Sequence, residues 1–290
     1  MSTDTKFVDL HTHSTASDGT DTPAAVVAAA AEADLAAIAL TDHDTLAGLE
    51  EAQTAGQMLG VEVVRGCEIS SGTEFGELHV LGLWLPNKTA VLTQKLAWLR
   101  QKRQERNHDI VQKLQDLGLG ITMEDVLTAA KGESVGRPHI AAALVDKGCV
   151  SSKKEAFREY LGDGGKAYLP KTVLSPEESV SLLAGLGATV SLAHPMLRKL
   201  PSDWLESMIG RLKDCGLTAI EAYHSEHSET QTRYCLALAR RFGLGVSGGS
   251  DYHGGNKPNI KIGKGYGGLR VSFAVLEDLR HHRIAVGLPV

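Results

Sequence analysis

The sequence predicts an α/β protein, a closed or nearly closed barrel of alternating strands and helices that a helical insertion interrupts. Strand-like apolar runs alternate with helical patterns near both ends of the chain, which is typical of a mainly parallel sheet covered by helices. The 290 residues suit such a barrel. No Gly-x-Gly-x-x-Gly follows the first strand, so an open dinucleotide-binding sheet is disfavoured.

Strands and helices are expected to alternate up to Leu85. Thr22 is a plausible N-cap with Pro23 in the first helical position, and Gly60 is expected to end the second helix. The expected strands are 7–10, 35–40, 61–71 and 78–85, and the expected helices are 22–34 and 45–59.

The alternation stops at Pro86, and no strand signal appears between 90 and 165. A long helix is expected over 89–118, followed by shorter helices over 122–131, 137–147 and 152–161. We therefore predict a barrel formed by 1–88 and 166–290, and a helical insertion over 89–165 that caps the substrate. Residues 95–170 carry 13 Lys/Arg and 10 Asp/Glu in a chain of net charge −5, which indicates a local anion site.

Alternation resumes after the insertion. This brings the barrel to about seven core strands, consistent with a distorted barrel. The expected strands are 188–193, 219–222, 244–247 and 284–286, and the expected helices are 205–215, 228–242 and 272–281.

Composition narrows the function classes. The net charge of −5 argues against a general nucleic-acid coat protein. The four cysteines form no Cys-x-x-Cys pair, so we expect reduced thiols and no zinc ribbon. The sequence has no apolar run long enough to span a membrane and no signal-like start, so we expect a cytoplasmic location, no membrane and no obligate protein partner.

Histidines and carboxylates gather where the predicted strands end. In His11-x-His13 both imidazoles point to one side of an extended segment, and Asp251-x-His253 repeats this spacing. Nine donor side chains are more than one ion can bind, and they suit two or three divalent ions. The combination of imidazole and carboxylate donors fits Mn²⁺, Zn²⁺ or Fe²⁺ better than Ca²⁺. The nine expected ligands are His11, His13, Asp18, His43, Glu68, His79, His194, Asp251 and His253.

Neighbouring polar residues are expected to support these ligands. Asp9, Asp42 and Asp44 are expected to orient ligands or cap backbone rather than bind metal. His224 follows another strand end, where contact with the substrate or with a ligand is one alternative and a structural role the other.

These motifs resemble those of the PHP (polymerase and histidinol phosphatase) family over the whole chain. The motifs are Asp9-Leu10-His11-Thr12-His13-Ser14 with Asp18-Gly19, Thr41-Asp42-His43-Asp44, Glu68 with His79, His194-Pro195, and Ser250-Asp251-x-His253. The resemblance implies a distorted (β/α)₇ barrel with a trinuclear metal site. It assigns His11, His13, Glu68 and Asp251 to one ion, Glu68, His79 and His194 to a second, and Asp18, His43 and His253 to a third.

The insertion resembles the branch that contains 3′,5′-nucleoside bisphosphate phosphatases and a 5′-to-3′ exoribonuclease. The implied activity is hydrolysis of the 3′-phosphate of a nucleotide such as pAp, giving AMP, by a hydroxide activated by two or three Mn²⁺ ions, with Fe²⁺, Zn²⁺ or Mg²⁺ as alternatives. The expected substrate-binding residues are Arg103, Arg106, Asn107, Arg137 and His139.

Three residues are candidates for protonating the leaving oxygen, namely Asp18, His43 and His253. The competing hypotheses are a 5′-to-3′ exoribonuclease on short RNA, a non-catalytic metal-binding module, and a histidinol phosphate phosphatase. The arginine-bearing insertion disfavours the last. None of the nine metal positions is lost, which disfavours the non-catalytic module.

Overall fold

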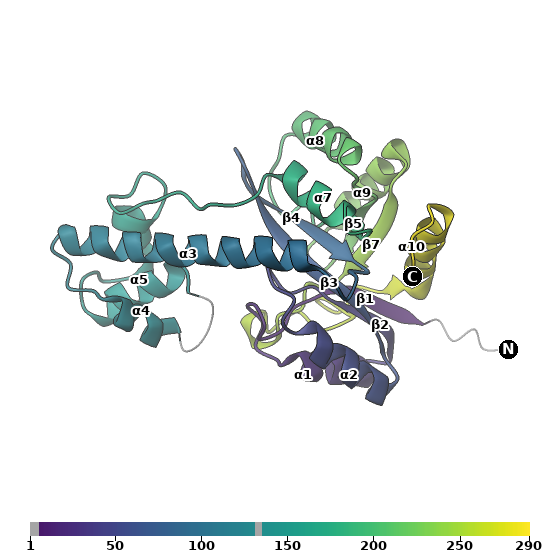
Figure 1. Cartoon of the computed structure of the whole chain (residues 1–290), viewed down its shortest axis with the longest axis horizontal. Helices are drawn as coiled ribbons and strands as arrows, with labels where there is room; N and C mark the ends of the chain where they lie inside the picture. The colour runs from purple at the N-terminus through teal and green to yellow at the C-terminus, as the bar shows by residue number, and fades with distance from the viewer. Residues whose placement is uncertain (1–5, 131–134) are drawn as a thin grey trace. The chain divides into compact units, whose positions relative to one another are not determined.

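A computed structural model describes residues 6–130 and 135–290 (Figure 1). The chain divides into two compact units, Met1–Thr93 with Leu174–Val290, and Gln94–Val173. We call them the barrel unit and the helical unit. The boundaries predicted at 88/89 and 165/166 both lie a little before the boundaries of these units.

The barrel unit is built on one eight-stranded sheet in the order β7-β6-β5-β4-β3-β2-β1-β8. Most neighbours are parallel, but β4 runs antiparallel to β3 and β5, and β8 runs antiparallel to β1. The strands are β1 (Phe7–Thr12), β2 (Leu35–Leu40), β3 (Glu62–Thr73), β4 (Gly76–Leu83), β5 (Thr189–Leu192), β6 (Ala219–His224), β7 (Gly245–Gly249) and β8 (Val271–Ser272).

The sheet curls until its two sides almost meet. Beyond β7, the backbone N–H of Asp251 donates to the carbonyl of His11 at 2.9 Å, and the N–H of His13 donates to the carbonyl of Tyr252 at 2.9 Å. These bonds join the carboxyl ends of β1 and β7. The predicted nearly closed β/α barrel is therefore confirmed.

Helices surround these strands, with α1 and α2 against β2 and β3, and α7, α8 and α9 toward β4 to β7 (Figure 1). Helix α1 begins as predicted, because Thr22 Oγ1 accepts from the N–H of Ala25 and Pro23 follows. The helices of this unit are α1 (Pro23–Glu32), α2 (Leu49–Leu59), α7 (Pro176–Ala184), α8 (Ser202–Asp214), α9 (Glu229–Phe242) and α10 (Phe273–Ala285), with a 3₁₀ turn η2 (Gly254–Asn256).

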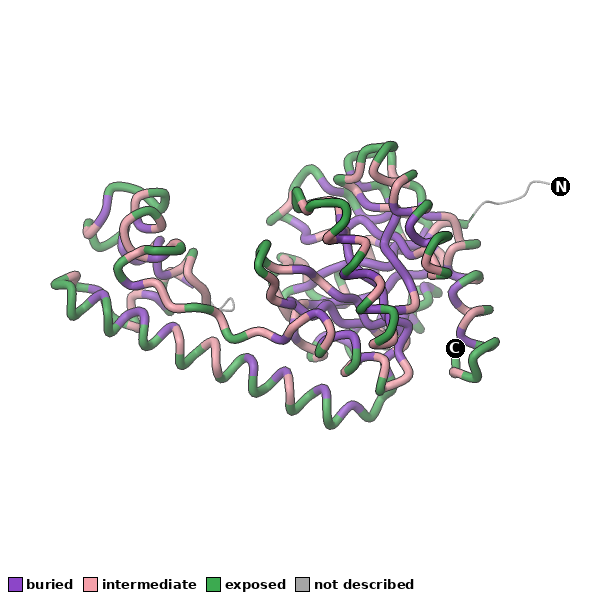
Figure 2. The backbone as a smooth tube through the Cα atoms, turned by 90° about the horizontal axis from the view of Figure 1, so that it is seen from above, coloured by how far each residue is buried: buried purple, intermediate pink, exposed green. Residues whose placement is uncertain are grey.

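The core lies on both faces of the sheet, and the strands are buried along most of their length (Figure 2). In β2, Ile38 and Leu40 pack with the residues of α1 and α2, whereas Ala37 and Ala39 pack on the opposite face. Burial on both faces explains the continuous apolar run of this strand. Apolar side chains fill the core along the strands, and polar side chains occupy the carboxyl ends of the strands.

The helical unit has its own apolar core, which includes Ile110, Leu114, Ile121, Val126 and Ile140. Its elements are α3 (Ala90–Asp116), whose first turn lies in the barrel unit, α4 (Met123–Ala130), α5 (Arg137–Asp146), α6 (Lys153–Ala156) and a π-helical turn η1 (Phe157–Leu161). Across the described residues, no helix is both long enough and apolar enough to span a bilayer.

Several element predictions were wrong. The expected strand over 284–286 is instead the end of α10, where Ile284 and Val286 are exposed and the buried Leu276, Leu279 and Arg283 recur at helical spacing. Helix α2 starts at Leu49 rather than Thr45, since Thr45 Oγ1 accepts from the N–H of Ala47 in a preceding turn. Helix α7 and the short strand β8 were not predicted.

Candidate metal centre

The nine histidines and carboxylates predicted from the strand ends come together at the carboxyl edge of the barrel. His11 and His13 leave β1 on the same side, and their Nε2 atoms lie 3.1 Å apart. Both side chains are fully buried. The period-two geometry of the strand thus produces the predicted convergence of two imidazoles.

Glu68 lies at the centre of the cluster. Its Oε2 is 3.1 Å from the Nε2 atoms of both His11 and His13 and 3.2 Å from His43 Nδ1. Its Oε1 is 2.9 Å from His79 Nδ1 and 3.0 Å from His194 Nε2. One fully buried carboxylate therefore faces imidazoles from β1, β4 and the loops after β2 and β5.

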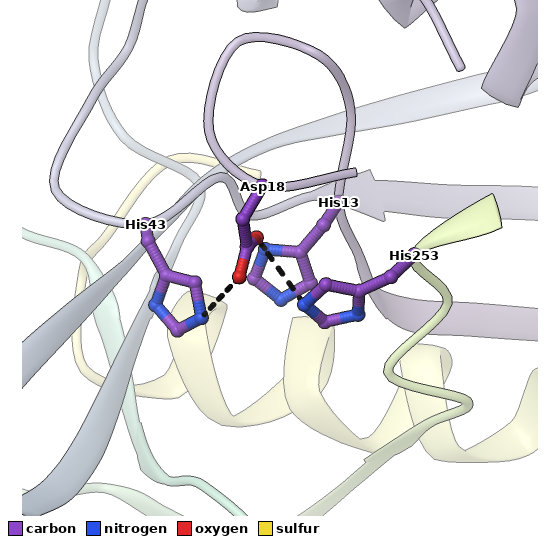
Figure 3. A group of neighbouring side chains, drawn as sticks. All are labelled: His13, Asp18, His43 and His253. Atoms are coloured by element: carbon purple, nitrogen blue, oxygen red, sulfur yellow. Dashed lines mark ion pairs between the residues drawn. The ribbon is translucent and has the colours of Figure 1, made fainter. Parts of the chain in front are cut away.

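Asp18, His43 and His253 line one side of the cluster beside His13 (Figure 3). Asp18 Oδ1 is 3.2 Å from His253 Nε2, and Asp18 Oδ2 is 3.9 Å from His43 Nε2. Asp18 is 54% exposed, whereas the other carboxylates of the cluster are buried, so it is the acidic group most open to an incoming molecule.

Asp251 and His194 occupy unusual backbone conformations. Their φ angles are 57° for Asp251 and 25° for His194, in a region that residues other than glycine seldom adopt. Asp251 Oδ1 lies 3.5 Å from His11 Nε2 and 3.3 Å from His13 Nε2. Backbone strain of this kind persists where surrounding contacts fix a side chain in place, and it concentrates at functional sites.

The donor atoms form three groups in which all ligand atoms lie within 4.8 Å of one another. These groups are His11, His13, Glu68 and Asp251; His13, Asp18, His43 and His253; and His43, Glu68 and His79. The first group contains the same four residues that the family resemblance implies for one ion. The second adds His13 to the three residues implied for another ion, and the third has His43 in place of the implied His194. His13, His43 and Glu68 each belong to two groups, as bridging positions between neighbouring ions would.

The cluster fits divalent cations. Nδ1 of His13, His43 and His79 is buried and makes no hydrogen bond with any residue that the structure describes, although two of these atoms approach Glu68 closely. A divalent cation held between these nitrogens and the carboxylate oxygens would satisfy both. Imidazole and carboxylate donors together suit transition-metal ions.

Charges within the cluster are coupled. Burial by itself raises the pKa of Glu68, but the imidazoles of His43 and His11 hold that pKa well below its ordinary value. Burial lowers the pKa of His43 to about 3, so its ring is neutral at neutral pH. Burial also lowers the pKa of His13, but its hydrogen bonds with Asp251 and Glu68 raise that pKa to about 9. When no cation is bound, protons on the imidazoles therefore neutralise the charge of the carboxylates. A cation that binds here must displace these protons.

Sequence reasoning missed Glu221, which lies fully buried on β6. Its carboxylate oxygens accept from His11 Nδ1 at 3.0 and 3.2 Å, and Oε2 accepts from the backbone N–H of His194 at 2.8 Å. It therefore fixes the tautomer and direction of one imidazole and the backbone of a second. The only sequence signal was an acidic residue inside a short apolar strand.

The supporting carboxylates behave as expected. Asp9 accepts from the N–H groups of Ser250 at 2.8 Å and Gly263 at 2.7 Å, and Asp42 accepts from the N–H of Ser14 at 2.8 Å. These contacts hold the loops that carry the cluster. His224 is buried, accepts from the N–H of Glu226 at 3.2 Å, and places Nε2 3.6 Å from Asp251 Oδ2.

The five expected substrate-binding residues all belong to the helical unit. Four of them make contacts inside it: Arg106 Nε donates to Leu169, Asn107 Nδ2 to Val135 and Arg137 Nη1 to Leu161, all at backbone carbonyls, while His139 Nδ1 accepts from the N–H of Gly136. Arg103 and Asn107 line a cavity of about 470 Å³ in this unit. Asn107 is almost fully buried, so its contact with Val135 holds the fold.

Comparisons with known proteins agree with this geometry. The PHP domain matches residues 9–160. A 5′-3′ exoribonuclease of Haemophilus influenzae is 32% identical over 249 residues, covering 86% of this chain and 90% of that protein. A 3′,5′-nucleoside bisphosphate phosphatase of Chromobacterium violaceum is 31% identical over 257 residues, covering 88% and 90%.

A solved structure from Bifidobacterium adolescentis, assigned as a metal-dependent phosphoesterase, superposes with a TM-score of 0.74 at 31% identity and covers 94% of this chain and 95% of that one. All three names describe enzymes that cleave phosphate esters, and the matches cover 86% to 94% of this chain. The chain therefore belongs to the PHP family and is a hydrolase of phosphate esters.

Proposed function

We propose that this hydrolase removes the 3′-phosphate from nucleoside 3′,5′-bisphosphates, such as pAp, and leaves the 5′-monophosphate. The observation that carries the proposal is a cavity of about 320 Å³ that ends on the cluster and is lined by Asp18, His43, His79, His194, Asp251 and His253 among others. This volume is at the lower end of small-molecule sites and suits a phosphoryl group with its ester. The bisphosphate phosphatase relative supports the choice of substrate.

The nine residues would hold two or three divalent ions, for which we propose Mn²⁺. Bound divalent ions lower the pKa of water and neutralise phosphoryl oxygens. The protein's part is to orient the ester and to handle the leaving group. Asp18 and His253 both line the cavity, with Asp18 Oδ1 3.2 Å from His253 Nε2. Burial raises the pKa of Asp18, but its hydrogen bond with His253 and the charges of His43 and His13 hold that pKa well below its ordinary value, so Asp18 is ionised. His253 is therefore the member of the pair that is placed to pass a proton to the 3′ oxygen as the bond to phosphorus breaks.

A second candidate function is 5′-to-3′ exoribonuclease activity at the same site. The relative of that name is 32% identical and covers 86% of this chain. Both reactions need a metal-activated water and an in-line leaving oxygen. They differ in whether the scissile phosphate is a terminal monoester or an internal diester, so product analysis separates them.

A release assay on protein reconstituted with Mn²⁺ tests these functions with pAp, AMP, histidinol phosphate and a five-nucleotide RNA as substrates. We expect free phosphate and intact AMP from pAp. Mononucleotide release from RNA at a higher kcat/KM would favour the exoribonuclease, and activity on histidinol phosphate alone would contradict the proposal. Glu68→Gln, prepared identically, is the control for contaminating phosphatases.

A further inference from the structure

Lys257 is a cation in the wall of the catalytic cavity, outside the nine expected ligands. Among the described residues that line this cavity it is the only lysine or arginine. Its side chain is 35% exposed. The other lining groups are imidazoles, carboxylates, Leu197 and Asn256, so the ammonium is the one permanent positive charge that the protein itself offers there.

The ammonium is held in place from two directions. Its Nζ lies 2.5 Å from Asp251 Oδ2, while Asp251 Oδ1 faces His11 and His13. The backbone of Lys257 follows the η2 turn, which begins directly after His253. Asn256 Nδ2 in this turn donates a hydrogen bond to the carbonyl of Asp18 at 2.7 Å and so holds the turn in place. The position of Lys257 is therefore fixed relative to both sides of the cluster.

Lys257 has donors to spare. An ammonium carries three N–H donors, and within the described part of the chain Asp251 is the acceptor in hydrogen-bond reach of Nζ. The remaining donors belong to a residue that lines the cavity. A phosphoryl oxygen in the cavity can accept from them while Asp251 keeps its own contact.

We propose that Lys257 binds the phosphoryl group of the substrate and favours terminal phosphate monoesters over internal diesters. A terminal phosphate monoester carries a charge of about −1.5 to −2 near neutral pH, whereas each diester linkage carries a charge of about −1. A fixed ammonium therefore gains more from a monoester. The inference rests on the proposed 3′-phosphatase function and names a residue that sets its specificity.

The test uses metal-loaded wild type, Lys257→Met and Lys257→Arg, with Lys264→Met as the matched control because Lys264 is an exposed lysine of the same loop. The probe is inorganic phosphate, whose binding is measured by titration calorimetry. We expect Lys257→Met to weaken phosphate binding by about tenfold to a hundredfold, the range of a hydrogen bond between charged groups. Lys257→Arg should restore most of it, and Lys264→Met should match wild type.

Two further measurements separate this role from mere neutralisation of Asp251. Metal content by mass spectrometry should be unchanged in Lys257→Met, and kcat/KM should fall for p-nitrophenyl phosphate much more than for bis(p-nitrophenyl) phosphate. Lost metal, equal losses on both esters, or unchanged phosphate binding would overturn the proposal. If wild type releases no phosphate from pAp while phosphate binding still depends on Lys257, the 3′-phosphatase function fails and the Lys257 inference stands.

Discussion

At the scale of single residues, Glu221 shows how the protein fixes the orientation of a ligand in the cluster without a bound ion. The carboxylate contacts His11 Nδ1 with both oxygens, so His11 Nε2 is left to face Glu68. A histidine held in this way is a better ligand, because the tautomer is fixed and the ring is more basic.

We expect Glu221→Gln to lower metal affinity by about tenfold to a hundredfold, since a neutral amide supports the imidazole less well. Competition with a fluorescent chelator measures the affinity directly. Glu229→Gln is the control, because Glu229 is 93% exposed on the neighbouring helix. An affinity equal to wild type would show that Glu221 holds only the fold.

The residues that sequence reasoning found and missed differ in their local surroundings. His11 and His13 belong to a dense polar motif at the end of β1, so spacing alone predicted their convergence. Lys257 lies six positions after Asp251, and the turn η2 brings the two side chains together. Glu221 stands singly in an apolar strand, and β6 brings it to His11, 210 positions away in the chain. No local pattern records such a contact.

At the scale of elements, the closure between β1 and β7 depends on a close approach of backbones. A Cβ atom built on Gly249 would lie 2.4 Å from both Cβ and N of His11. The two strands can therefore come together only because this position lacks a side chain.

Gly249→Ala should destabilise the protein by roughly 1 to 3 kcal/mol and weaken metal binding, because β7 must shift away from His11. Urea unfolding and metal titration measure the two effects. Gly268→Ala is the matched control, since a Cβ there meets nothing within 4 Å. Similar stability of both variants would contradict this account of the closure.

The helical unit carries the arginines that we expected to bind a second phosphate. Arg137 donates to the carbonyl of Leu161, and its guanidinium lies 5.6 Å from the ring of Tyr168. If it also binds the 5′-phosphate, Arg137→Ala should raise KM for pAp much more than KM for a monophosphate ester. Steady-state kinetics on both substrates test this, with thermal melting as a control for the lost Leu161 contact. Equal changes in both KM values would exclude the second-phosphate role.

Local sequence signals predicted some helices and strands correctly and others wrongly. Helix α1 was predicted well because Thr22 and Pro23 are strong start signals. The run at 284–286 looked like a strand, but Arg283 donates to the carbonyls of Gly187 and Pro289 and so anchors the last turn of α10. A tertiary contact of this kind overrides β-propensity, and three residues give too little periodicity to distinguish a helix from a strand.

At the scale of the whole molecule, bound ions should stabilise the barrel unit. Its cluster concentrates the buried carboxylates Glu68, Glu221 and Asp251 among histidines. Mn²⁺ at a hundred times its dissociation constant adds about 2.7 kcal/mol, a rise in melting temperature of roughly 4 to 6 °C for a protein of this size. We expect chelator-treated protein to regain this increment on adding Mn²⁺, measured by calorimetry. Glu68→Gln should regain much less, and an equal gain would place the ions elsewhere.

The barrel architecture was predictable because alternation and length constrain it strongly. The antiparallel direction of β4 was not predicted, although β3 ends at Thr73 and β4 begins at Gly76, and a link this short cannot make a parallel crossover. The closure through Tyr252 likewise joins segments about 240 positions apart, which no window of sequence reveals.

The closure between β1 and β7 also determines when, during synthesis of the chain, the cluster of metal ligands can form. The hydrogen bonds from Asp251 to His11 and from His13 to Tyr252 require the end of β7 to reach β1. A nascent chain that stops before Gly249 lacks Asp251, His253 and Lys257, although it already carries the first seven donors. A chain that ends there therefore cannot complete the cluster, and the nine donors can meet only after β7 and the loop beyond it have been synthesised.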